Sequence, residues 1–394
     1  MESHPRPDFS NTAIAFAGKS NQELSKSYWM FRMMNAKWLV DSLSALAPLA
    51  LKLRLPIEPV VKATVYDQFC GGESIAGCEK SMDELHRYGI GTILDYSVEG
   101  KESETEFDAC QAEIIRTIQK AKGDARIPFS VFKTTGVVRF GLLEKVNAGA
   151  TLGKEEAAEW ERAQKRVDGI AKAAFEAGQP LFIDAEESWI QDAIDALATQ
   201  MMERYNREAP IVYNTIQLYR HDRLAHMKQA FNTARQNGYW YAVKLVRGAY
   251  MEKERERAAE KGYPSPIQPD KAASDRDYNA ALAFCVENID HMAVCSGSHN
   301  EESNHYLADL MAKHGIDRKH PRIWFAQLKG MSDHISYNLA HAGYQVAKYL
   351  PYAPVRAMLP YLIRRAQENT SIAGQMSREL TLIVAERKRR KTGN

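Results

Sequence analysis

The sequence has 394 residues, of which 45% are hydrophobic and 26% charged, so the chain can bury a core and is neither disordered nor fibrous. Its 52 Lys and Arg residues nearly balance 50 Asp and Glu residues, and this net charge of +2 does not favour nucleic acid as a partner. The five Cys residues form no CxxC pair, which excludes a disulfide scaffold and a zinc ribbon.

The first 80 residues lack strong strand signals, and residues 1–84 are predicted to form an N-terminal helical arm. The segment 22–53 is rich in Leu, Ala and Met and is apolar on one side. The apolar face of residues 28–54 is interpreted first as core packing, with a dimer contact and a membrane contact as alternatives. The longest apolar stretch, 42–51, contains Pro48 and is shorter than the roughly 20 residues that a membrane span needs.

From about residue 85 the pattern changes to short β-rich apolar runs that alternate with amphipathic helical segments. This alternation predicts an α/β protein with a parallel sheet, and eight strands over residues 85–380 favour a (β/α)8 TIM-type barrel. An open, doubly wound sheet is the competing architecture, and the absence of GxGxxG after a strand weighs against its dinucleotide-binding form. The predicted strands are Thr92–Tyr96, Phe129–Lys133, Pro180–Asp184, Ile211–Gln217, Trp240–Val246, Met292–Ser296, Arg322–Leu328 and Gln345–Leu350.

Three of the intervening segments have a clear helical period of apolar residues. They carry Phe107, Cys110, Ile114 and Ile118; Ile190, Ile194, Leu197 and Met201; and Leu224, Met227, Phe231 and Ala234. Two charge-rich segments are predicted to be solvated instead. They are the helix 251–262 and the basic C-terminal tail 381–394, whose run ERKRRK could alternatively touch an anionic membrane.

In a (β/α)8 barrel the carboxyl ends of the strands form the catalytic face, and most of the predicted strands end in polar groups. These groups are Asp95, Glu99, Lys133, Asp184, Glu186, Glu187, Gln217, Lys244, Arg247, Ser298, His299, Asn300, Gln327 and Tyr349. The helix after the last strand carries Arg364, Arg365 and Glu368 on one face, and the arginine pair is either an anion site or part of a solvated face. His299 and His305 are not at the helical spacing of a zinc pair, so no metal is expected.

Several of these strand-end segments resemble the flavin-dependent proline dehydrogenases, in their monofunctional form. The resemblance extends from about residue 66 to about residue 370. It is carried by YDQFCGGES (66–74), IDAEESWIQ (183–191), VKLVRGAYMEKE (243–254), GSHNEES (297–303), QLKGMSDH (327–334) and YLIRRAQEN (361–369). It implies a distorted (β/α)8 barrel that holds FAD and oxidises L-proline to 1-pyrroline-5-carboxylate, by hydride transfer to flavin N5, with a membrane quinone as the electron acceptor.

The resemblance also implies roles for individual residues. Substrate binding falls to Lys133, Arg364 and Arg365 at the proline carboxylate, to Tyr250, Tyr349 and Leu328 around the ring, and to Glu368. Catalytic roles fall to Asp184, which orients an arginine and the substrate, and to Lys244. Cofactor binding falls to Gln217 and Lys244 at the isoalloxazine, and to Ala185, Arg247, Gly248, Ala249, Ser298 and His299. Glu99 pairs with Arg364 as a gate.

Two other activities stay open. Hydroxyproline dehydrogenase belongs to the same family, and the aromatic ring of Tyr349 favours proline over a ring that carries a hydroxyl. A lysine at a strand end, Lys133 or Lys244, could instead form a Schiff base in an aldolase-type barrel.

The start of the sequence, MESHPRPDF, has the features of neither a secretory signal nor a typical transit peptide. This favours a bacterial cytoplasmic location, with peripheral attachment to the inner membrane, and the mitochondrial matrix is the alternative. A homo-oligomer is compatible with the sequence, which does not fix the oligomeric state.

Overall fold

The structure, a computed structural model, describes residues 6–34, 58–98, 101–371 and 375–392, and of residues 60, 364, 366–371 and 375–377 it describes the backbone only. Eight strands form a closed barrel in chain order; β1 pairs with β8, and each strand from β2 to β7 pairs with the next, all in parallel. The predicted (β/α)8 barrel is therefore confirmed. Its strands are β1 (Ile90–Tyr96), β2 (Phe129–Lys133), β3 (Leu181–Asp184), β4 (Val212–Gln217), β5 (Tyr241–Val246), β6 (Met292–Gly297), β7 (Ile323–Leu328) and β8 (Val346–Tyr352).

The contacts divide the chain into two compact units, and the division falls within β7. The central unit comprises residues 100–326, and the terminal unit comprises residues 1–99 together with 327–394. The predicted division into an arm (1–84), a barrel (85–380) and a tail (381–394) stays a prediction, and the terminal unit contains residues from all three of those parts.

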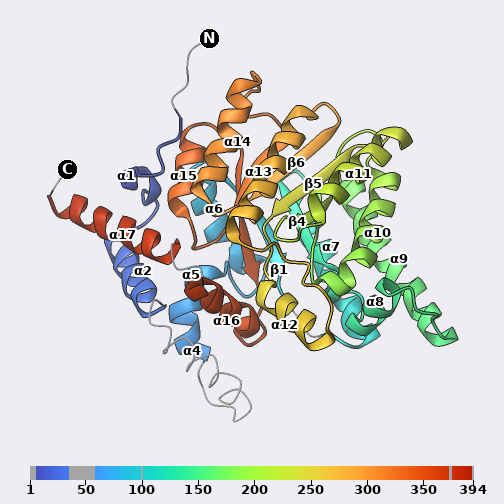
Figure 1. Cartoon of the computed structure of the whole chain (residues 1–394). Helices are drawn as coiled ribbons and strands as arrows, with labels where there is room; N and C mark the ends of the chain where they lie inside the picture. The colour runs from blue at the N-terminus through green and yellow to red at the C-terminus, as the bar shows by residue number, and fades with distance from the viewer. Residues whose placement is uncertain (1–5, 35–57, 99–100, 372–374, 393–394) are drawn as a thin grey trace. The chain divides into compact units, whose positions relative to one another are not determined.

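In the central unit, helices lie on the outer side of strands β4 to β6 (Figure 1). The predicted helical periods are confirmed, because Phe107, Ile190 and Phe231 lie on the buried faces of α7, α10 and α11. Strands covered in this way are buried on both faces, which explains why they read as continuous apolar runs. The helices of this unit are α7 (Glu104–Ala121), η3 (Thr134–Gly136), α8 (Phe140–Asn147), α9 (Lys154–Ala177), α10 (Ser188–Tyr205), α11 (Arg223–Asn237), α12 (Met251–Lys261), α13 (Lys271–Glu287) and α14 (Glu301–Lys313).

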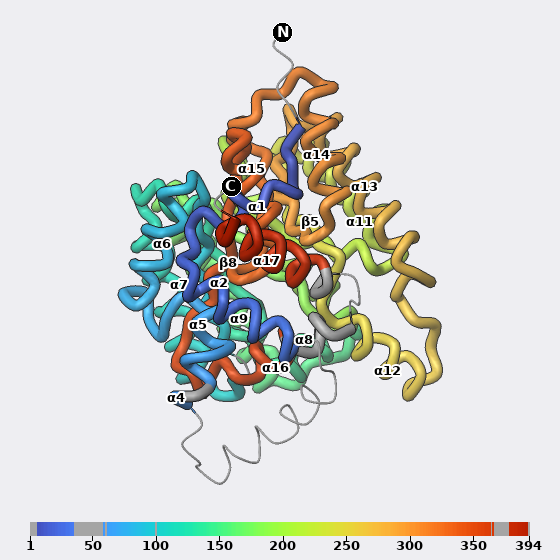
Figure 2. Tube along the Cα trace, turned by 90° about the vertical axis from the view of Figure 1, so that its left-hand side faces the viewer, coloured from blue at the N-terminus to red at the C-terminus, as the bar shows by residue number. Residues whose placement is uncertain are grey.

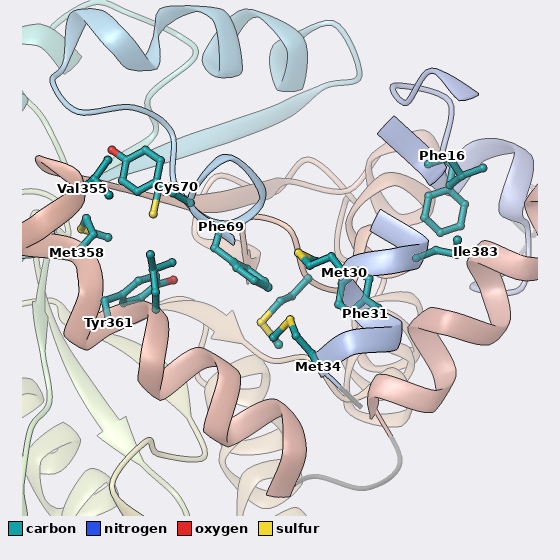
Figure 3. Packing of buried hydrophobic residues seen from close by; sticks show 14 of the residues in the cluster. Phe16, Met30, Phe31, Met34, Phe69, Cys70, Val355, Met358, Tyr361 and Ile383 are labelled. Carbon is teal, nitrogen blue, oxygen red and sulfur yellow. The ribbon is translucent and has the colours of Figure 1, made fainter. Parts of the chain in front are cut away.

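The terminal unit joins segments from both ends of the chain around β1 and β8. Its helices are α1 (Thr12–Ala15), α2 (Asn21–Met34), α4 (Glu58–Val61), η1 (Lys62–Tyr66), α5 (Asp67–Phe69), η2 (Ala76–Cys78), α6 (Glu79–His86), α15 (Asp333–His341), α16 (Val355–Ser371) and α17 (Gln375–Thr392). Figure 3 shows a hydrophobic cluster that joins several of these helices, with Phe31 of α2, Phe69 of α5, Met358 of α16 and Ile383 of α17. Part of the predicted apolar face of residues 28–54 is thus core, and residues 35–57 lie outside the described residues.

Helix α17 packs against α1 and α2, which Figure 2 shows from the side. The Arg390 guanidinium donates hydrogen bonds to the carbonyl oxygens of Phe16 and Lys19, at 2.9 and 2.8 Å, and to Glu386. Glu386 is fully buried; burial raises the pKa of its carboxyl, but hydrogen bonds from Arg389 and Arg390 outweigh this and hold the pKa at about 2. The prediction that ERKRRK is a solvated run is therefore wrong for Glu386, which is buried, and for Arg390, whose carbonyl partners Phe16 and Lys19 lie far away in the sequence.

Within the described ranges, every helix is too short or too polar to cross a lipid bilayer.

Replacing Phe31 by Ala should lower the free energy of unfolding by about 3 to 5 kcal/mol, because it opens a cavity in this cluster. Trp29→Ala on the same helix is the matched control, since Trp29 is 56% exposed and its loss should cost no more than about 0.5 kcal/mol. Urea denaturation followed by circular dichroism measures both values. Equal losses in the two variants would contradict the packing described here.

Candidate active site

A buried ion pair lies at the carboxyl end of the strands of the central unit. Lys244, the fourth residue of β5, is 4% exposed and its ammonium group pairs with the carboxylate of Asp184, the last residue of β3. The Lys244 ammonium also lies 5.3 Å from the centre of the Phe182 ring. The strand register places Lys133 of β2 opposite Asp184, so these two predicted site residues lie on neighbouring strand ends, and Lys244 reaches Asp184 from β5.

The turn after β2 is held by a carboxylate from the turn after β3. Glu186 is 3% exposed, and it accepts hydrogen bonds from the Thr135 backbone N–H at 3.0 Å and from the Thr135 hydroxyl at 2.5 Å. Burial raises the pKa of Glu186 to about 7, although the positive charge of Lys133 and the Thr135 hydrogen bonds act in the opposite direction. The sequence marked Glu186 as a strand-end residue without assigning it a role.

The guanidinium of Arg247 is fixed by several groups at the ends of β5 and β6. It donates hydrogen bonds to the Asp275 carboxylate at 2.7 Å and to the hydroxyls of Ser298 and Ser303 at 3.0 and 2.9 Å, and it lies 4.4 Å from the Tyr278 ring centre. The predicted cofactor residues Arg247 and Ser298 are therefore in direct contact, and His299 follows at the same strand end. Asp275 and Tyr278 lie on α13, outside every motif of the sequence analysis, whereas Ser303 of α14 ends the motif GSHNEES but had been given no role.

Gly248 adopts φ +138°, a backbone conformation that residues with a side chain rarely occupy. A Cβ atom at this position would lie 2.4 Å from the buried ring of Tyr219, so the close approach of this ring also requires glycine. Ala249 and Tyr250 continue the same loop, and Tyr250 forms the N-terminal boundary of α12.

Gln217, the last residue of β4, is 3% exposed, and its side-chain oxygen has no hydrogen-bond partner among the described residues. A buried acceptor without a partner is costly, so this atom suits a bound group that donates a hydrogen bond. Ala185 is buried directly after Asp184. No group of three or more His, Cys, Asp or Glu side chains is placed to hold a metal within the part of the chain that the structure describes.

Helix α12 is tied to the loop between β3 and α10. Glu254 is fully buried and accepts hydrogen bonds from the Ser188 backbone N–H and hydroxyl, both at 2.6 Å, and Lys253 pairs with Glu187. The prediction that this charged helix is simply solvated is therefore wrong for Glu254. The carboxylate lies at the N-terminus of α10, where it satisfies a free backbone N–H group and interacts favourably with the helix dipole.

The other predicted site residues belong to the terminal unit. Tyr349 is buried in β8, and its carbonyl oxygen accepts a hydrogen bond of 2.9 Å from the Lys329 backbone N–H. Leu328 ends β7, and the guanidinium of Arg365 in α16 lies 5.4 Å from the Tyr361 ring centre. Arg364 and Glu368 lie in α16, where only their backbone is described, and Glu99 lies outside the described residues.

A buried lysine that the sequence did not single out supports the ends of β7 and β8. Lys348 donates hydrogen bonds to the carbonyl oxygens of Leu328 and Met331, at 3.2 and 2.8 Å, and pairs with Asp333 at 2.8 Å. Burial raises the pKa of the Asp333 carboxyl, but Lys348 and Lys19 together hold it well below its ordinary value.

A closed parallel barrel with buried ionisable groups at the carboxyl ends of its strands defines a (β/α)8-barrel protein of the enzyme type. Residues 78–378 match the proline dehydrogenase family. The chain is 31% identical over 426 residues to "Proline dehydrogenase 1, mitochondrial" of Dictyostelium discoideum, with 96% of this chain and 74% of the relative covered. The chain therefore belongs to the proline dehydrogenase family.

Two further comparisons concern a second relative and a solved structure. The chain is 31% identical over 412 residues to "Hydroxyproline dehydrogenase" of Xenopus laevis, with 95% of this chain and 88% of the relative covered. Among solved structures, proline utilization A (PutA) from Bdellovibrio bacteriovorus, inactivated by N-propargylglycine, matches 91% of this chain with a TM-score of 0.71. At 18% identity this likeness shows the fold alone, and the chain spans 38% of the length of that protein.

Gly248→Ala should lower the free energy of unfolding by at least about 2 kcal/mol, because both the backbone conformation and the Tyr219 ring oppose a Cβ atom. Gly262→Ala is the matched control: Gly262 has φ +71° but open space around it. That change should cost about 1 kcal/mol from backbone strain alone. Denaturation of both variants without added ligand tests this expectation, and a smaller loss for Gly248→Ala would refute it.

Proposed function

We propose that this chain is an FAD-dependent proline dehydrogenase that oxidises L-proline to 1-pyrroline-5-carboxylate and passes the electrons to a membrane quinone. The main support is the gathering of buried polar side chains on the neighbouring strand ends β3 to β6, in a chain of the proline dehydrogenase family. Parallel barrels bind their ligands at this end of the strands.

The residues of the central unit are chemically suited to a flavin. The side-chain oxygen of Gln217 is a buried acceptor that a flavin N–H could satisfy, and Lys244 offers a buried cation near the same strand ends. Arg247, held by Asp275 and Ser298, would bind the pyrophosphate together with the backbone of Gly248 and Ala249, while Ala185 and His299 would contact the cofactor. When bound, FAD supplies the acceptor for the hydride that leaves the substrate.

The substrate would be held by its carboxylate. Lys133, Arg364 and Arg365 would supply the cations, with Glu368 beside the arginines and Glu99 as a gate partner of Arg364. These cations would also lower the pKa of the proline amine by like-charge repulsion, which favours the neutral nitrogen that oxidation requires. Tyr250, Tyr349 and Leu328 would enclose the ring and Asp184 would orient it, so that binding fixes the geometry of the reaction.

Hydroxyproline is the alternative substrate, and the similarity to a relative named hydroxyproline dehydrogenase supports it. We favour proline, because the buried aromatic ring of Tyr349 would compete for space with a hydroxyl on the substrate ring.

A quinone acceptor would require contact with a membrane surface. On α2, Trp29 and Met33 are exposed and Arg32 lies over the Trp29 ring, a combination that suits the interface of an anionic membrane. The relatives named mitochondrial support the mitochondrial matrix, the alternative to a bacterial cytoplasmic location.

Absorbance spectra of the purified protein, taken before and after anaerobic addition of L-proline, test this proposal. We expect flavin bands that bleach with proline and much less with hydroxyproline. Bleaching by hydroxyproline alone would establish the alternative substrate. A colourless protein that gains no flavin on reconstitution would refute the flavoenzyme and favour the aldolase-type reaction at Lys133 or Lys244.

Arg365→Met should raise KM for proline at least about tenfold, because a charge-assisted contact to the carboxylate is lost, while the flavin content stays unchanged. Arg356→Met is the matched control in the same helix, since Arg356 pairs with Glu58 and both side chains are largely exposed. Steady-state kinetics with flavin quantification separates the two variants. A KM for Arg365→Met within about threefold of the wild-type value would refute the carboxylate assignment.

A further inference from the structure

Glu186 is a buried carboxylate for which neither the fold nor the family comparison provides a role. Its carboxylate holds Thr135, two residues after Lys133, through the backbone N–H at 3.0 Å and the hydroxyl at 2.5 Å. Both hydrogen bonds reach across from the β3 end to the β2 end, so Glu186 fixes the course of the chain immediately beyond Lys133.

Glu186 is itself held from behind by a chain of buried groups. Its backbone N–H donates to the Gln191 side-chain oxygen at 2.8 Å, and the Gln191 amide donates to Asp195 at 2.9 Å. Asp195 pairs with the fully buried Arg223. Because every link is buried and satisfied, the Glu186 carboxylate has little freedom to move away from the turn.

The carboxylate of Glu186 interacts electrostatically with the ammonium group of Lys133. The pKa of Glu186 is raised by burial to about 7, and Lys133 is the largest opposing influence on it. The negative charge of Glu187 also raises the pKa of Glu186, although Glu187 is paired with Lys253. Asp195 lies further from the Glu186 carboxylate, beyond Gln191. Glu186 therefore exchanges between its charged and neutral forms near neutral pH, within electrostatic reach of Lys133.

We propose that Glu186 is a positioning residue for substrate binding, which orients the Lys133 turn and whose negative charge competes with the substrate carboxylate for Lys133. This inference rests on the proposed function, since it takes Lys133 as a carboxylate anchor. When Glu186 is charged, Lys133 is partly neutralised and a second anion is repelled. When Glu186 takes up a proton, the repulsion is removed and the anion binds more tightly.

The test uses cyclopentanecarboxylate, which has the ring and the carboxylate of the substrate but no amine that titrates. Its dissociation constant is measured by calorimetry on the flavin-loaded protein between pH 6 and pH 8.5. For the wild type we expect binding to weaken as the pH rises, by between about threefold and about tenfold, with a midpoint near the Glu186 pKa of about 7.

Glu186→Gln retains an oxygen acceptor for Thr135 but carries no charge, so its binding should be independent of pH and as tight as that of the wild type at pH 6. Thr135→Val removes one donor to the carboxylate, which should move the midpoint to higher pH. Glu187→Gln is the matched control, because it removes the adjacent charge and should leave the weakening of binding with rising pH in place. If Glu186 had a merely structural role, Thr135→Val would leave the midpoint of the pH dependence unchanged.

Two results would overturn the inference. The first is a wild-type dissociation constant that does not change with pH. The second is a pH dependence that persists in Glu186→Gln, which would then belong to another group such as His299. If Glu186→Gln does not fold, an unmoved midpoint in Thr135→Val overturns it equally. Lys133→Met separates this failure from that of the proposed function. If Lys133→Met binds cyclopentanecarboxylate as tightly as the wild type, Lys133 is not the carboxylate anchor and the proposed function loses that part. If Lys133→Met binds more weakly but Glu186→Gln keeps the pH dependence of the wild type, only the role of Glu186 is overturned.

Discussion

Opposite charges that share a buried strand end must stay together, because taking an ion out of water costs several kcal/mol unless a partner is present. Lys244 and Asp184 are such a pair, and they come from β5 and β3, which are separated by β4. In the observed register Asp184 lies opposite Lys133 and Lys244 lies opposite Thr215, and a slip of one residue in either strand would turn its charged side chain to the other face of the sheet. The ion pair thus sets the position of the surrounding polar groups, including Arg247 three residues further along.

The strands of this barrel were predictable because burial on both faces leaves continuous apolar runs, and β2 and β3 agree with the predicted runs within one residue. Strand β8 was predicted to end at Leu350 but continues to Tyr352. Pro351 argued against a longer strand, since proline is unfavourable inside a strand. Here the Pro351 carbonyl still accepts a hydrogen bond from Gly71, at 2.8 Å, and the strand continues.

The candidate site was predictable only in part. Its residues were indicated by strand ends and by motifs of the family, but most of their partners were not. Glu254 looked like one charge among many on an exposed helix, because its partner Ser188 is 66 residues away. Lys348 looked like an ordinary strand lysine, although it is fully buried against Asp333. Patterns in a sequence report local period and composition, whereas these roles depend on pairs of residues that only the fold brings together.

The pairing of β1 with β8 has a consequence for the order in which the molecule can be built. Residues from Ile90 to Tyr96 lie opposite residues from Val346 to Tyr352, so the first strand leaves the ribosome long before its neighbour. The central unit is one continuous segment that can assemble in the meantime, whereas the terminal unit needs both of its distant parts. Until β8 emerges, β1 presents an unpaired edge, which can pair with other chains and so exposes the nascent chain to aggregation.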